Sequence, residues 1–152
     1  MTLDGTFAVA APRERVWRSL RDPAIVAACV PGCSGVEVVS PNAYRATIAV
    51  SLGPISATFD LAIDIMDETP PEKISMRTRG AEGGRASMLS AVSVVTLQEA
   101  GNARTEVHYT SNVSLTGRFG KFGLGVFRKK ADQLANDFSK RFADSLQTAE
   151  AS

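Results

Sequence analysis

The fold is decided by residues 53–65, which read GPISATFDLAIDI. After the Gly-Pro turn, apolar side chains alternate with small or polar ones, and the apolar positions are Ile55, Ala57, Phe59, Leu61, Ile63 and Ile65. A period of two is that of a β-strand with one buried face. This stretch therefore predicts a strand in a sheet that has one apolar side.

Similar alternation flanks this strand in both directions. It recurs around 46–50, 74–78 and 107–115, while 87–97 carries small and apolar residues on both faces. The connections between these segments are short and rich in Gly, Pro and Asn, as at Gly101-Asn102. Connections this short imply antiparallel neighbours.

The two ends of the chain predict other elements. A strand over Leu3–Ala10 is followed by a helix opened by Pro12, and Asp22-Pro23 starts a second short helix that runs through Cys29. From about Arg118 the period becomes helical, and some 28 residues at 1.5 Å each predict a helix about 42 Å long. Its apolar stripe consists of Phe119, Phe122, Val126, Phe127, Leu134, Phe138, Phe142 and Leu146.

A helix with one apolar face must pack on something, and the concave side of the sheet is the large apolar surface available. The order of strand, two short helices, antiparallel strands and long final helix predicts an α+β helix-grip fold. We expect a single domain over residues 1–147, with a frayed tail over 148–152.

Composition excludes several classes of protein. The 152 residues are 44% hydrophobic and 22% charged with a net charge of +1, which argues against disorder and against a dedicated nucleic-acid binder. No apolar run reaches the roughly 20 residues that span a bilayer. The N-terminus resembles no export signal, so we expect a cytoplasmic protein.

Cys29, Cys33 and a lone His108 predict no metal site, and we expect both thiols to be unpaired.

The inward positions mix bulky side chains with small ones, among them Ala46, Ala57, Ser90 and Gly123. An empty space of about 300 Å³ would cost about 7 kcal/mol, so a cavity of that size should hold ligand, lipid or water. Composition alone leaves a cavity and a fully packed core equally open. The predicted ligand contacts are Phe59, Leu61, Ile63, Met76, Met88, Tyr109, Phe119, Phe122, Gly123, Val126 and Phe127.

The alternation of side chains along the predicted strands leaves few titratable groups on the inner face for catalysis. Asp60, Asp64 and His108 fall on the outward positions, and Tyr109 is the inward residue with a polar tip. The sequence has no Ser-His-Asp arrangement and no glycine-rich phosphate loop. We therefore predict no catalytic residue.

Several motifs together resemble one family. They are APRERVW at 11–17, CVPGC at 29–33, GPI at 53–55, PPE at 70–72 and the helix over 131–146. On these motifs almost the whole chain resembles the CoxG subunit of carbon monoxide dehydrogenase, a branch of the START-like (SRPBCC, Bet v 1-like) superfamily. The Pro-Gly-Cys turn combined with Gly-Pro is the more specific part of the resemblance.

The resemblance implies an accessory protein that binds a lipophile, a quinone such as menaquinone or ubiquinone, for a molybdenum hydroxylase. It favours a cavity over a packed core. Many relatives carry a membrane-binding segment after the domain, whereas this sequence ends at Ser152, so we expect peripheral contact with the inner face of the cytoplasmic membrane. The alternatives are an aromatase or cyclase acting on a hydrophobic substrate, and a solid-core module that docks redox subunits together.

The start of the final helix breaks two local rules. Glycine is frequent over 117–125, and the basic residues there and just beyond have no acidic neighbour, although positive charge opposes the dipole at a helix N-terminus. We hypothesise a deformable lid over 117–125 and a basic surface that meets anionic headgroups or an acidic partner. That surface consists of Arg118, Lys121, Arg128 and Lys129.

Overall fold

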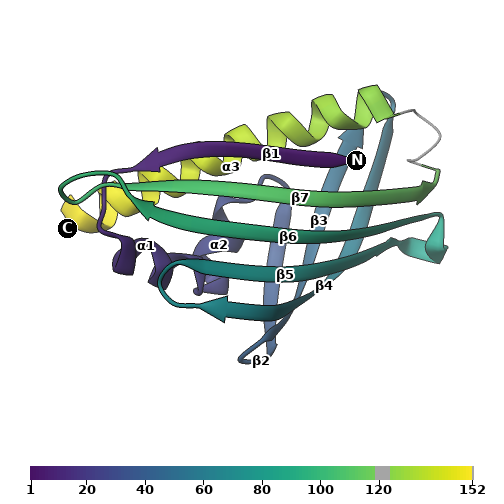
Figure 1. Ribbon diagram of the computed structural model, residues 1–152. Helices are drawn as coiled ribbons and strands as arrows, with labels where there is room; N and C mark the ends of the chain where they lie inside the picture. The colour runs from purple at the N-terminus through teal and green to yellow at the C-terminus, as the bar shows by residue number, and fades with distance from the viewer. Residues whose placement is uncertain (119–123, 152) are drawn as a thin grey trace.

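A computed structural model of the chain describes residues 1–118 and 124–151, and Figure 1 shows its arrangement. The strands form one antiparallel seven-stranded sheet in the order β1-β7-β6-β5-β4-β3-β2. They are β1 (Thr2–Val9), β2 (Cys33–Ser40), β3 (Ala43–Leu52), β4 (Ile55–Thr69), β5 (Lys73–Glu82), β6 (Ser87–Glu99) and β7 (Thr105–Gly117). The helices are α1 (Arg13–Leu20), α2 (Pro23–Cys29), the 3-10 turn η1 (Gly83–Arg85) and α3 (Leu124–Ala151).

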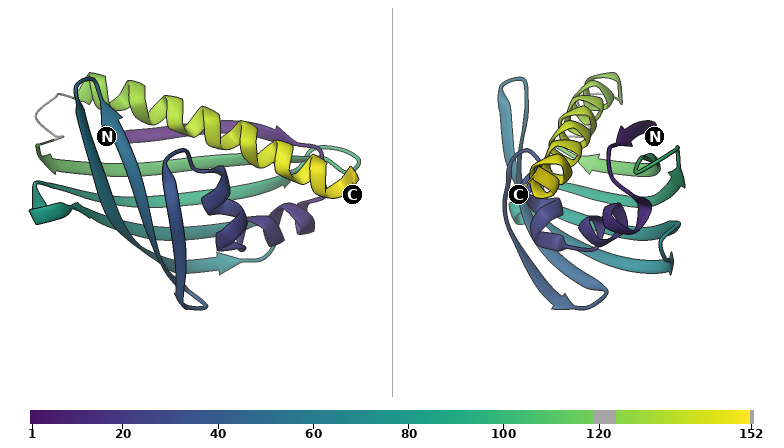
Figure 2. Two further views of the ribbon diagram at one scale, coloured as in Figure 1. Left: turned by 180° about the vertical axis from the view of Figure 1, so that it is seen from behind. Right: turned by 90° about the vertical axis from the view of Figure 1, so that its left-hand side faces the viewer.

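The sheet curls around the long helix. Seen end-on in Figure 2, the β2–β3 hairpin and β4 stand across from β5, β6 and β7, and α3 runs between these two sides. The short helices α1 and α2 lie near the C-terminal end of α3 (Figure 2). This arrangement confirms the predicted α+β helix-grip fold.

Two elements differ from the sequence-based expectations. The strand β2 had not been predicted, because it lies at the edge of the sheet and most of its side chains are exposed, so it has no apolar alternation. The final helix is described from Leu124 on, whereas the sequence predicted a start at about Arg118. Gly117 has a φ of +86°, and the Arg118 amide donates to the Ala86 carbonyl (2.7 Å), so the chain is held against β6 at this point instead of entering a helix.

The apolar core is divided between the two ends of α3. At the C-terminal end, Phe142 and Leu146 are buried in one cluster with residues of β1, α1, α2, β6 and β7. At the other end, Phe127 packs against a second cluster formed around Leu52, Ala57 and Phe59. The helix is thus anchored at both ends, and the space between the anchors is where a cavity can form.

The turn between α2 and β2 requires glycine. Gly32 has a φ of +83°, a conformation that side chains rarely adopt, and its carbonyl accepts a hydrogen bond from the Ala49 amide (2.9 Å). A Cβ atom on Gly32 would collide with the Ala49 carbonyl oxygen. The glycine of the CVPGC motif is therefore explained by the close approach of the α2–β2 turn to β3.

We expect Gly32→Ala to lower the free energy of unfolding by about 1–3 kcal/mol, because it adds both backbone strain and a clash with β3. Urea denaturation followed by circular dichroism would measure this loss. Gly35→Ala is the matched control, since a Cβ atom there meets nothing within 4 Å. Equal stability of the two variants would contradict this explanation of the turn.

Candidate ligand-binding site

A cavity of about 370 Å³ lies between the middle of α3 and the concave face of the sheet. It is more than twice the volume of an engineered 150 Å³ cavity that binds benzene, and it lies in the range of small-molecule sites. No lining side chain among the described residues carries a formal charge. The arrangement can enclose an apolar molecule of about two fused rings.

Small side chains keep this space open. On α3 the cavity is lined by Ala135 and Ser139, one helical turn apart, together with Phe138. On the sheet it is lined by Ala46, Ser93 and Ser111 among larger apolar groups. Because α3 is held at both ends by aromatic and leucine side chains, the short side chains in its middle do not reach the sheet.

The cavity brings together four of the eleven predicted contacts. Leu61, Ile63, Met76 and Tyr109 come from β4, β5 and β7 and all line it. Phe59 is buried in the second core cluster beside the cavity, and Phe127 packs against that cluster. The predicted contacts Phe119, Phe122 and Gly123 lie outside the described residues.

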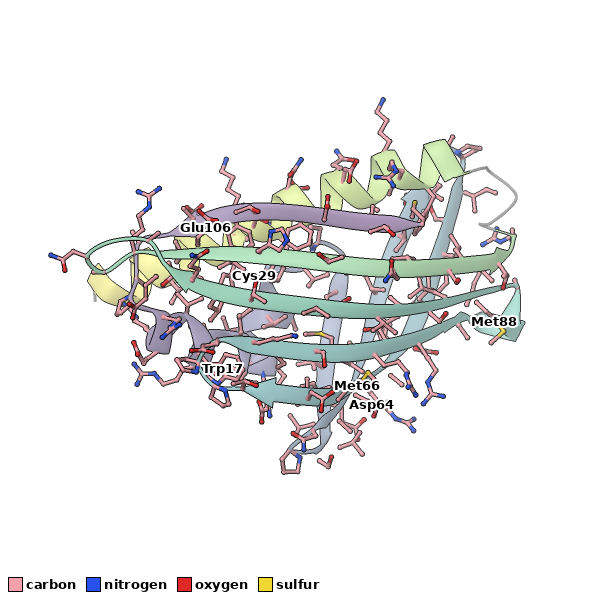
Figure 3. All side chains as sticks on the ribbon, in the orientation of Figure 1. Trp17, Cys29, Asp64, Met66, Met88 and Glu106 are labelled. Carbon is pink, nitrogen blue, oxygen red and sulfur yellow. The ribbon has the colours of Figure 1, made fainter. Side chains whose placement is uncertain are left out.

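The expected inward placement of Met88 is wrong. Met88 is 46% exposed on the outer face of β6 (Figure 3), because the inward positions of this strand are the odd-numbered ones from Ser87 to Leu97. Ser90, also expected inward, shares the outer face with Met88. Val126, half-exposed on α3, does not line the cavity. The sequence could not show which face of β6 lies inward, since both faces carry small or apolar residues.

Sequence reasoning missed the lining provided by the short helices and the edge strand. Val26, Ala27 and Val30 of α2 and its following turn line the cavity with Cys33 and Val36 of β2. The only signal for this placement was the apolar character of α2.

The two cysteines have different surroundings. Cys33 belongs to the cavity lining, while Cys29 is buried in the first core cluster, where burial raises the pKa of its thiol. Both cysteines are unpaired, as expected.

The polar atoms of the cavity lie mainly on β6 and β7. The hydroxyls of Ser93 and Ser111 hydrogen-bond to one another across these strands at 2.7 Å. The hydroxyl of Tyr109 lies over Gly5 of β1, where the missing side chain makes room for the ring. Burial, reinforced by the negative charges of Asp132 and Asp4, raises the pKa of Tyr109.

The wall beside α1 is held by the guanidinium group of Arg21. It donates to the Tyr44 hydroxyl (2.6 Å) and to the Pro41 carbonyl (3.2 Å), and it pairs with the Glu68 carboxylate (3.0 Å). Tyr44 lines the cavity with its ring and turns its hydroxyl to this cluster. The charge of Arg21 is thereby neutralised outside the cavity.

Glu82 is a carboxylate on the inner face of the sheet that the alternation of the sequence did not predict. It ends β5 opposite Phe59, its side chain is 10% exposed, and it accepts a hydrogen bond from Ser87 (2.8 Å) and pairs with Arg118. The hydrogen bond from Arg118 is the main cause that lowers the pKa of Glu82. This carboxylate does not line the 370 Å³ cavity.

The predicted outward positions of Asp60 and His108 are confirmed by their exposure. On the outer face of the sheet, the His108 ring hydrogen-bonds with the Thr6 hydroxyl at 2.8 Å. Neither side chain can therefore act on a molecule inside the cavity.

Only some of the residues of the predicted basic surface are exposed. Arg118 is engaged by Glu82 and also donates to the Ser56 carbonyl (3.2 Å), so it ties the chain to β4 and β5. Arg128 and Lys129 are exposed on α3, and Arg128 donates to the Thr2 carbonyl (2.8 Å). Lys121, and with it most of the hypothesised lid, lies outside the described residues.

Comparison with family models supplies the decisive finding. The model that describes the CoxG subunit of carbon monoxide dehydrogenase matches residues 5–147. The chain belongs to the CoxG family. A comparison with curated proteins finds no match.

Solved structures agree with the CoxG assignment at the level of the fold. A conserved protein from Geobacillus kaustophilus is 23% identical with a TM-score of 0.90, and the match covers 98% of this chain and 97% of that one. A START superfamily protein from Mycobacterium smegmatis is 12% identical with a TM-score of 0.78, over 97% and 98% of the two chains. The Zhui aromatase/cyclase from Streptomyces sp. R1128 is 16% identical with a TM-score of 0.71, over 97% and 93%.

CoxG membership indicates an accessory subunit, and the solved structures show that its fold is START-like. None of the helices in the described part of the chain combines the length and apolar character needed to cross a bilayer. The described residues also contain no group of three or more His, Cys, Asp or Glu side chains placed to hold a metal ion.

The Glu82–Arg118 pair predicts a component of acid sensitivity in this CoxG domain. Folding lowers the pKa of Glu82, so the ionised carboxylate stabilises the folded state at any pH above the usual glutamate pKa of about 4.3. This stabilisation is lost as the pH falls through the lowered pKa of the folded state. We expect Glu82→Gln to be less stable than the wild type at pH 7, with the difference shrinking below about pH 4.

Urea midpoints of both proteins at pH 7 and in acid would measure this effect, with Glu106→Gln on the exposed outer face as control. A constant difference between wild type and Glu82→Gln across the acid range would contradict it.

Proposed function

We propose that this CoxG-family protein is a non-catalytic carrier of a quinone, menaquinone or ubiquinone, for a molybdenum hydroxylase of the carbon monoxide dehydrogenase type. The observation that supports the proposal is the 370 Å³ cavity with an uncharged, mostly apolar lining among the described residues. A quinone ring system is neutral and flat, and it matches such a lining in size and polarity.

Energetics disfavour an empty cavity, so the space holds either water or a ligand. If a space of 370 Å³ stayed empty, the cavity term of about 24 cal/mol per Å³ would cost about 9 kcal/mol, which is comparable with the net stability of a domain. Each buried methylene group of a ligand returns about 0.8 kcal/mol. Since the volume is too small for a whole polyprenyl chain, the ring and the first part of the tail would be enclosed.

A carrier must also reach its donor and acceptor. The family name supports association with a dehydrogenase, and quinones reside in the membrane, so we place the protein in the cytoplasm with peripheral contact at the inner membrane face. Exposed Arg128 and Lys129 of α3 would contribute about 1 kcal/mol each at an anionic surface.

The likeness in fold to an aromatase/cyclase keeps an enzyme as the second candidate. Such an enzyme needs a group in the cavity that transfers protons near neutral pH. Among the lining residues, Tyr109 has a raised pKa, which makes it a weaker acid than ordinary tyrosine. Glu82 lies outside the lining and is stabilised as the charged form. Both observations support a carrier over an enzyme.

The proposal predicts that protein purified from a quinone-containing bacterium retains quinone. Solvent extraction followed by mass spectrometry would identify and quantify it. In Ala135→Leu, the added side chain fills the cavity, and we expect at least a tenfold loss of bound quinone with no loss of thermal stability.

Asn136→Leu, one residue along on the exposed face of α3, is the matched control and should retain quinone. Extracts in which wild type and Ala135→Leu carry equal amounts of quinone, or none, would reject the carrier function.

A further inference from the structure

The two serines on the cavity floor differ from the side chains that flank them across the sheet. Ser93 and Ser111 are direct partners in the β6–β7 pairing, and both point into the cavity. Next to them on the same face lie Met76 of β5 and Leu3 of β1, both apolar. A pair of hydroxyls therefore sits in an otherwise apolar strip across the sheet.

The Ser93–Ser111 pair has one more hydrogen to donate than its own contact uses. Each hydroxyl has a single donor hydrogen. The contact at 2.7 Å uses one of the two, and the described residues provide no acceptor for the other. A donor that faces an apolar cavity without an acceptor is unfavourable, so the pair is suited to a ligand that brings an acceptor into the cavity.

We infer that the Ser93–Ser111 pair is the polar subsite of the cavity and binds a carbonyl-type oxygen of a neutral lipophile. This inference rests on the proposed function and deepens it by naming the ligand chemistry and the residues that recognise it. One hydroxyl donates to the other, and the second donates to the ligand oxygen, while the apolar walls hold the body of the ligand.

The surroundings also select against anions. The described lining has no cation to pair with a carboxylate, and burying an unpaired charge is far more costly than burying a carbonyl group. The acidic residues Asp4 and Asp132 lie near Tyr109 at the neighbouring edge of the cavity, where they disfavour further negative charge. A fatty acid is therefore a poor ligand, and a neutral ketone or quinone is a good one.

Three probes of similar size separate the effects on binding of the carbonyl group, the apolar ring body and a negative charge. They are 2,3-dimethyl-1,4-naphthoquinone, whose blocked ring positions avoid addition of a thiol, 2,3-dimethylnaphthalene, which lacks the carbonyl groups, and 2-naphthoate, which is an anion. Binding is measured by calorimetric titration of the delipidated full chain. We expect the quinone to bind about tenfold tighter than the hydrocarbon, the value of one hydrogen bond, and naphthoate to bind weakest.

The test variant is Ser93→Ala/Ser111→Ala, in which the quinone should lose its tenfold advantage while the hydrocarbon binds as before. The chain offers a matched control in Ser90→Ala/Ser114→Ala, which removes the directly paired serines of the same two strands on the outer face. The control should keep the full preference for the quinone.

The possible outcomes distinguish the polar subsite from the carrier function. An unchanged preference in Ser93→Ala/Ser111→Ala, or naphthoate binding as tightly as the quinone, would overturn the polar subsite while the cavity remains a lipophile site. Failure of both the quinone and the hydrocarbon to bind wild-type protein would overturn the proposed function together with this inference.

Discussion

The structure depends on how one long helix packs across a curved sheet. The helix α3 contacts the sheet through Phe127 near its start and through Phe142 and Leu146 near its end, and each contact belongs to a compact apolar cluster. Between its two anchors the helix stands off the concave face of the sheet. Ala135 and Ser139 in the middle are too short to bridge the gap, and the cavity is the consequence.

Charged groups are paired around this cavity and not inside it. Arg21 and Glu68 form an ion pair beside the α1 wall, and Glu82 and Arg118 pair where β5 ends. Each pair also ties together segments that are distant in the sequence, so it supports the curl of the sheet. The described lining itself stays uncharged, and the charges of Asp4 and Asp132 near Tyr109 are negative, so the cavity suits a neutral ligand.

Sequence patterns predicted the site best where one face of a strand was clearly apolar. The alternation of β4 placed Leu61 and Ile63 correctly on the cavity side, and that of β7 did the same for Tyr109. On β6, where both faces carry small or apolar residues, the sequence placed Met88 on the wrong face of the sheet. The edge strand β2 lacked a buried face and therefore lacked a pattern.

By itself, the sequence determined the order of elements apart from β2, the antiparallel sheet and the family, because alternation, helical period, turn residues and short motifs are local properties of the chain. Only the tertiary structure decided the cavity volume, the pairing of Ser93 with Ser111 and the capture of Arg118 by Glu82. These features depend on strand register and on the separation of α3 from the sheet. Both are set by contacts between residues far apart in the chain, and no local pattern records them.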